Sequence, residues 1–129
     1  ALGWTQGENP QVDFICPMID ARRMEVYSAI YSSNLQCLKP ISADIIESDS
    51  YNQLLQGKTV VFIGDGAEKC QDLLQGEKRT FRGDFLPSAA YLGKEGYKKF
   101  QESNIEDVAY FEPFYLKEFI ALKSKKGAI

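Results

Sequence analysis

The sequence predicts an α/β fold in which helices cover a mixed β-sheet, and two patterns carry that prediction. Up to residue 41, apolar runs with the period of strands follow one another across short polar turns. Beyond residue 47, strand-like runs alternate with helical patterns, as in units whose helices connect parallel strands. The chain has 129 residues, of which 44% are hydrophobic and 26% charged, which suits one globular domain.

Three strands are expected in succession. Residues 12–19 place apolar side chains on both faces, as in a central strand, and the alternating residues 24–31 pair with them as a hairpin. Residues 20–23 form the turn between the two strands. Residues 35–41 form the third strand, where Pro40 predicts a position at a sheet edge or a bulge.

The period then changes to that of helices. Ser48 or Asp49 is expected to cap a short helix that runs through Leu55. The β-branched and aromatic run 58–63 predicts a strand covered on both faces. That strand stops at a glycine-containing turn, residues 64–67.

Two further helices and one strand complete the pattern. The apolar side of the first helix is expected to consist of Cys70, Leu73 and Leu74. After a short strand, 79–81, a longer helix starts at Pro87–Ser88, and Gly93 and Gly96 within it would permit close packing. Its apolar residues are Ala89, Leu92, Tyr97 and Phe100. The resulting order βββαβαβα is the topology of a ribonuclease H-like unit.

Several classes of function are disfavoured by composition. The sequence contains no histidine, the commonest general base and zinc ligand, so histidine-based triads are excluded. The scattered cysteines, Cys16, Cys37 and Cys70, predict reduced, mostly buried thiols in a cytoplasmic protein. A net charge of -3 provides no general surface for nucleic acid, and no apolar run suits a membrane helix.

The glycine turn is the first candidate site. Gly64, Asp65, Gly66 and Ala67 follow a buried strand and precede a helix, a place where unpaired N–H groups can approach a phosphate or an adenosine. No P-loop or G-x-G-x-x-G motif is present. A plain strand-to-helix turn is therefore the favoured interpretation, and a nucleotide contact is the alternative.

The polar hairpin turn is the second candidate. Arg22 and Arg23 would clamp an anion, or they would pair with Asp20 and Glu25 and neutralise the turn. The paired, exposed turn is the favoured interpretation.

The third candidate is the C-terminal stretch that contains Glu112, Pro113, Tyr115, Leu116 and Lys117. Aromatic residues surround it, and we expect them to pack the chain end onto the domain, with a partner surface as the alternative. These aromatic residues are Tyr110, Phe111, Phe114, Tyr115 and Phe119.

A metal site of the ribonuclease H type is a remote alternative. It would need several carboxylates at adjacent strand ends, and neither Asp13 nor Asp20 lies in the middle of the first strand. The other candidate carboxylates are Asp44, Glu47, Asp49, Asp65 and Asp84. We expect no metal and no cofactor.

Three of these stretches together resemble the TsaB family, also called YeaZ. Residues 17–27 are similar to the family's "DAR…EVY" hairpin, residues 61–67 to its "GxGA" turn, and residues 112–117 to its "EPxYLR" segment. Lys117 stands where arginine is usual. The likeness covers essentially the whole chain in the family's order.

The resemblance implies one lobe of a two-lobed, actin-like protein. Residues 12–122 would form its C-terminal ribonuclease H-like lobe, and residues 1–11 would be the remnant of an upstream helix and linker. Residues 123–129 would form a flexible tail. Ala1–Trp4 resembles the end of the helix that leads into this lobe.

The resemblance also implies a function in making threonylcarbamoyladenosine in tRNA. The family member is a non-catalytic subunit that supports the transferase TsaD, with the ATPase TsaE as a further partner. It would meet tRNA only through that complex, and homodimerisation stays open. The alternative is a nucleotide-binding or hydrolytic fragment that uses Gly64–Ala67, in keeping with the family's older label of glycoprotease.

Overall fold

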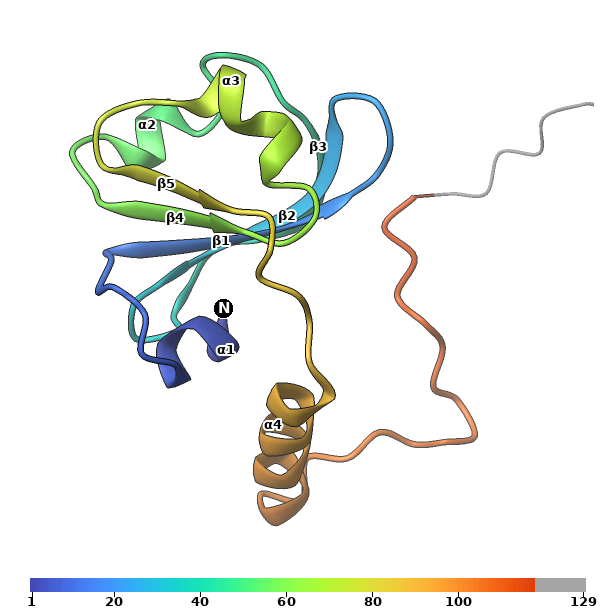
Figure 1. Ribbon diagram of the computed structural model, residues 1–129. Coiled ribbons are helices and arrows are strands. Elements are labelled where there is room, and N and C mark those ends of the chain that lie inside the picture. Colours follow the sequence, from blue (N-terminus) through green and yellow to red (C-terminus); the bar gives the residue numbers. More distant parts are fainter. Residues whose placement is uncertain (118–129) are drawn as a thin grey trace, which may run out of the picture.

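A five-stranded mixed sheet forms the centre of the protein, whose computed structural model describes residues 1–117 (Figure 1). The strands lie in the order β3-β2-β1-β4-β5. β1 is antiparallel to β2 and parallel to β4, so the hairpins and the crossovers meet at this strand. The strand bounds are β1 Phe14–Asp20, β2 Glu25–Ser32, β3 Cys37–Ile45, β4 Val60–Ile63 and β5 Arg79–Arg82.

Short helices cover both faces of the sheet. α2 and α3 lie on one face and α1 on the other, while α4 stands away from the sheet (Figure 1). Their bounds are α1 Leu2–Gln6, α2 Asn52–Leu55, α3 Gln71–Leu74 and α4 Ala89–Gln101, with a 3-10 turn η1 at Glu68–Cys70. The predicted α/β fold of the ribonuclease H-like type and the predicted order βββαβαβα are thereby confirmed.

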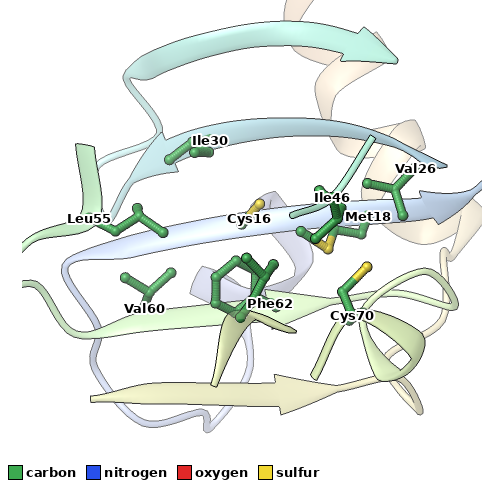
Figure 2. Packing of buried hydrophobic residues seen from close by; sticks show 11 residues of the cluster. Cys16, Met18, Val26, Ile30, Ile46, Leu55, Val60, Phe62 and Cys70 are labelled. Carbon is green, nitrogen blue, oxygen red and sulfur yellow. The ribbon is translucent and has the colours of Figure 1, made fainter. Parts of the chain in front are cut away.

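The core has two parts, one on each face of the sheet. Under α2 and α3, Phe62 is fully buried and stacks on Phe81 with ring centroids 4.8 Å apart. Figure 2 shows this cluster, whose labelled members are Cys16, Met18, Val26, Ile30, Ile46, Leu55, Val60, Phe62 and Cys70. On the opposite face, Trp4 of α1 packs with Ile15, Val61 and Ile63. Both β1 and β4 are therefore covered on both faces, as their continuous apolar runs predict.

The edge strand β3 is bulged where the sequence places a proline. Ser28 of β2 pairs with Ser42, whereas Ile30 pairs with Lys39, so β3 carries one extra residue between these pairs. Pro40 lies in that interval, where no ladder hydrogen bond from its nitrogen is needed. The predicted edge or bulge is confirmed.

The two short helices are smaller than predicted. α2 begins at Asn52 rather than at Ser48 or Asp49, because residues 47–51 form turns and Tyr51 adopts a left-handed φ of 64°. In α3, Leu74 is fully buried but Leu73 is 36% exposed, contrary to prediction. A single helical turn presents only the residue four positions after Cys70 to the sheet.

α4 begins as predicted but its apolar side is uncovered. Ser88 caps it by accepting a hydrogen bond from the Ala90 N–H. Only the first turns touch the fold, where Tyr91 lies against Gly3 and stacks on Phe85. Within residues 1–117, no atom outside the helix backbone and the adjacent residues lies within 4 Å of the position of a Cβ at Gly93 or Gly96, so the predicted close packing is not found. The exposed apolar residues of α4 are Leu92, Tyr97 and Phe100.

The C-terminal coil also departs from the expectation. Aromatic residues that were predicted to pack the chain end onto the domain are exposed, namely Tyr110, Phe111, Phe114 and Tyr115. A run of aromatic residues in the sequence does not identify what covers their side chains. Within residues 1–117, no other segment covers these four. Phe119, the end of the predicted lobe and the predicted tail 123–129 lie outside the described residues. Within residues 1–117, no helix has the length and apolar character needed to cross a bilayer.

Candidate functional site

The three stretches singled out in the sequence meet at one end of the central strand β1, its carboxyl end. Asp65 of the glycine turn accepts a hydrogen bond from the Asp20 N–H at 3.1 Å. Lys69, just beyond that turn, forms an ion pair with the Asp20 carboxylate. On the other side of the hairpin, Lys117 Nζ lies 2.6 Å from Glu25 Oε2. We call this arrangement the hairpin junction, defined by Asp20, Glu25, Asp65, Lys69 and Lys117.

The glycines of the turn are required by the backbone of β1. Gly64 has φ of +102°, and a side chain there would collide with the Met18 carbonyl oxygen. A Cβ at Gly66 would lie 3.0 Å from the Ile19 carbonyl carbon. Packing between β4 and β1 therefore accounts for both glycines.

The N–H groups of this turn are largely occupied within the protein. Gly64 donates to the Arg82 carbonyl, Gly66 to the Met18 carbonyl and Ala67 to the Gly64 carbonyl, at 3.0–3.2 Å. A phosphate cradle would need several of these donors to point at the ligand. This geometry favours the interpretation of Gly64–Ala67 as a tight turn.

The hairpin turn differs from the favoured expectation in its ion pairs. The structure pairs Asp20 with Lys69 and Glu25 with Lys117, rather than pairing either acid with Arg22 or Arg23. Both arginines adopt left-handed φ values, 72° and 51°, which turn the chain between the antiparallel strands but direct the acids toward other elements. Lys69 is 49 residues from Asp20 in the sequence, and Lys117 is 92 residues from Glu25. Local sequence patterns do not identify partners at such separations, so these two pairs are not predicted.

Each ion pair shifts the pKa of an exposed group. The hydrogen bond from Lys69 is the main reason that the pKa of Asp20 lies below its ordinary value, and the Arg22 N–H adds to it. The hydrogen bond to Glu25 raises the pKa of Lys117. These charges are close to water, so the pairs orient segments more than they stabilise the fold.

Only the end of the C-terminal motif reaches the junction. Glu112, Pro113 and Tyr115 are exposed, Leu116 is half-buried, and Lys117 makes the contact. An arginine at this position would offer a two-pronged contact to a carboxylate, whereas Lys117 offers one ammonium group.

A second polar cluster, between β2, β3 and the turn before α2, was not predicted as a unit. Asp44 Oδ2 accepts hydrogen bonds from Ser28 Oγ at 2.5 Å, from Tyr51 Oη at 2.7 Å and from Lys39 Nζ at 2.7 Å. Ser42 donates to the other carboxylate oxygen. The buried Ser28 was the available signal, because a hydroxyl within an apolar strand face needs a partner.

Hydrogen bonding decides the ionisation of this cluster. Partial burial alone would raise the pKa of Asp44, but the bonds from Lys39, Ser28, Tyr51 and Ser42 outweigh it and hold the pKa below its usual value. Burial raises the pKa of Tyr51, which keeps its hydroxyl as a donor. The cluster is a set of mutually satisfied groups that ties β2 and β3 to Tyr51.

The remaining carboxylates do not assemble into a metal site. Asp84 is bound by Arg82, and Asp65 by the Asp20 N–H, while Asp44 is held by Lys39. Among residues 1–117, no three histidine, cysteine, aspartate or glutamate side chains lie close enough together to hold a metal ion.

The cysteines are also not arranged for catalysis. Burial raises the pKa values of Cys16 and Cys70, so both thiols stay protonated at neutral pH. Cys16 and Cys70 are buried, as predicted for most of the thiols, whereas Cys37 is exposed on the edge strand.

An apolar groove of about 670 Å³ adjoins the junction. It lies between α1, the start of α4 and the ends of β1 and β4, and its lining includes Gly64 and Asp65 of the glycine turn. Its apolar lining includes Leu2, Pro17, Ile19, Leu35, Leu86 and Leu92. The shape suits an apolar side chain or ring more than a free phosphate.

The element order and the sheet topology are those of an α/β protein with a ribonuclease H-like, actin-like fold. No known protein family profile and no curated protein matches the chain. Among solved structures, it is similar to an uncharacterized protein with similarity to peptidase YEAZ from Pseudomonas aeruginosa, with a TM-score of 0.70 and 17% identity. The match covers 90% of this chain and 55% of that one, so this chain spans about half of its length. At such identity the likeness establishes the shared fold.

We predict that Gly64→Ala destabilises the protein while Gly93→Ala does not. The first change forces an alanine into a positive φ against the Met18 carbonyl and should cost about 2 kcal/mol or more. The second fills open space in a helix and should stabilise by about 0.5–1 kcal/mol. Urea unfolding of both variants measures the difference. Equal free energies of unfolding would contradict the proposed packing constraint.

We further predict that Asp44 stabilises the fold in a pH-dependent manner. Because its pKa in the folded state is depressed, its contribution is present above the unfolded value, near 3.8, and is lost as pH falls through the folded pKa. Asp44→Asn should lower the free energy of unfolding at neutral pH by about 2 kcal/mol, because four donors lose a charged acceptor. The deficit should shrink below pH ~4. A deficit independent of pH, measured by urea unfolding, would show that the charge is unimportant.

Proposed function

We propose that this chain is the C-terminal lobe of a TsaB-family (YeaZ-like) protein and serves as a non-catalytic subunit that supports the transferase TsaD. The observation that carries the proposal is the hairpin junction. All three family-like stretches contribute to it, although they are far apart in the sequence. The shared fold with a YEAZ-like protein agrees with this assignment.

The chemistry of the junction favours a scaffold over a hydrolase. Asp20, Asp65 and Glu25 each engage another part of the chain, and three N–H groups of the glycine turn are used by protein carbonyls. A hydrolase with a serine or cysteine nucleophile commonly relies on histidine as the base, and this sequence has no histidine. The proposal therefore assigns the acyl-transfer chemistry to TsaD and contact with tRNA to the complex.

A partner surface is supported by the uncovered apolar side chains. Leu92, Tyr97 and Phe100 of α4 are 64–75% exposed, and the following coil adds further exposed aromatic residues. Clusters of this kind are typical of protein–protein interfaces. In the proposed complex, TsaD and TsaE act with the whole two-lobed protein, in the cytoplasm.

A nucleotide-binding role is a second candidate, and the apolar groove is the observation that favours it. Gly64 and Asp65 in the groove lining would face the polar part of an adenosine, and Pro17, Ile19 and Leu92 would contact its ring. Hydrolysis would need further groups to hold the phosphates, because the N–H groups of Gly64, Gly66 and Ala67 are occupied. The two candidates therefore differ in whether nucleotide binds in the apolar groove of the protein alone.

The test reconstitutes threonylcarbamoyladenosine formation from TsaD, TsaE, tRNA and the natural polypeptide that carries this sequence. We expect product only when the polypeptide is present, and co-purification of TsaD with it. Titration of the polypeptide alone with magnesium–ATP, followed by backbone amide resonances, should give no shifts at the groove residues Ile19, Gly64 and Asp65 with an affinity tighter than roughly millimolar. Product formation without the polypeptide would refute the subunit role, and micromolar ATP affinity with shifts at these groove residues would favour the second candidate.

A further inference from the structure

A second cavity lies at the opposite end of the sheet from the hairpin junction. It has a volume of about 360 Å³ and lies between the loop that joins α2 to β4 and the loop that joins α3 to β5. Polar and charged side chains dominate its lining, chiefly Asn52, Gln56, Lys58, Gln75, Lys78 and Arg79. Nothing in the proposed subunit role uses this cavity, which we call the basal pocket.

The basal pocket concentrates positive charge in an acidic protein. Lys58, Lys78 and Arg79 line it together with one acid, Glu77, although the chain carries a net charge of -3. The four ion pairs found among residues 1–117 include none of these three cations. Their charge is therefore not neutralised by a neighbouring carboxylate within the described part of the chain. Lys58 Nζ lies 5.7 Å from the centroid of the Phe14 ring, a contact that leaves its positive charge in place for an anion.

Arg79 is held in place by the protein itself. Its Nη1 donates to the Leu74 carbonyl at 2.7 Å, and its Nη2 donates to Asn52 Oδ1 at 2.9 Å. These bonds fix the plane of the half-buried guanidinium group and leave further N–H groups for a ligand. A fixed guanidinium loses little entropy on binding, which makes it a good hydrogen-bond donor to phosphate oxygens.

The chemistry of the lining selects a phosphate group. Guanidinium, ammonium and carboxamide N–H groups are donors that match phosphate oxygens, whereas one carboxylate cannot hold a metal ion alone. The volume falls in the range of pockets that hold a small organic ligand, so the phosphate would be attached to a larger group. We propose that the basal pocket binds a phosphate group carried by a nucleotide or by an RNA backbone.

The test follows backbone amide resonances of the protein during titration with inorganic phosphate, ATP and a short RNA oligonucleotide at constant ionic strength. We expect saturable shifts at Lys58, Gly76 and Lys78. Tighter binding of ATP than of RNA would identify a nucleotide as the source of the phosphate, and the reverse would identify RNA. Shifts confined to residues 64–67, or no saturable shift with any of the three probes, would overturn the proposal.

Matched charge variants distinguish specific binding in the basal pocket from general attraction to surface charge. Lys58→Gln/Lys78→Gln should weaken binding of the tighter probe about tenfold, whereas Lys98→Gln/Lys99→Gln, with the same charge change on α4, should leave it within about twofold. Glu77→Gln should strengthen binding by about twofold, because it removes a like charge from the pocket. Equal weakening by both lysine pairs would show general surface attraction and would refute a built site.

Discussion

The close approach of the β4 turn to the end of β1 is the constraint on which the rest of the structure depends. Gly64 lies so near the Met18 carbonyl that no side chain fits between them. This contact allows the turn to cross the end of β1 and places Asp65 against the Asp20 N–H. Lys69 then reaches the hairpin, and the buried face of α3 closes over Phe62. Packing alone therefore requires a glycine at this position.

The two ends of the sheet differ in how their polar groups are used. At the carboxyl end of β1, acids and lysines from distant segments are bonded to one another, and the turn's N–H groups are mostly occupied. At the amino ends of β4 and β5, Lys58 and Lys78 line a pocket without a paired acid among the described ion pairs. The stretches that resemble family motifs thus hold parts of the fold together, while cationic side chains without an ion-pair partner among residues 1–117 lie at the other end of the sheet.

Local patterns predicted the elements whose surroundings are local. The run Val60–Ile63 predicts a strand covered on both faces because it contains no polar side chain, and Ser88 predicts the start of α4 because its cap bond is made two residues along the chain. The same patterns did not predict that the apolar side of α4 would be uncovered, since a helical period does not identify its partner. Nor did they predict the bonds of Asp20 and Asp44, which depend on how the strands are placed in three dimensions.

The most direct test of this account is amide hydrogen exchange at the hairpin junction. The Gly66 N–H donates to Met18, and the Asp20 N–H donates to Asp65. If the junction is a structural unit, both amides should exchange slowly, and Asp65→Ala should release the Asp20 amide while the Gly66 amide stays protected. Rapid exchange of both amides in the unmodified protein would contradict the account, because it would show that the turn is free of β1 and available to a ligand.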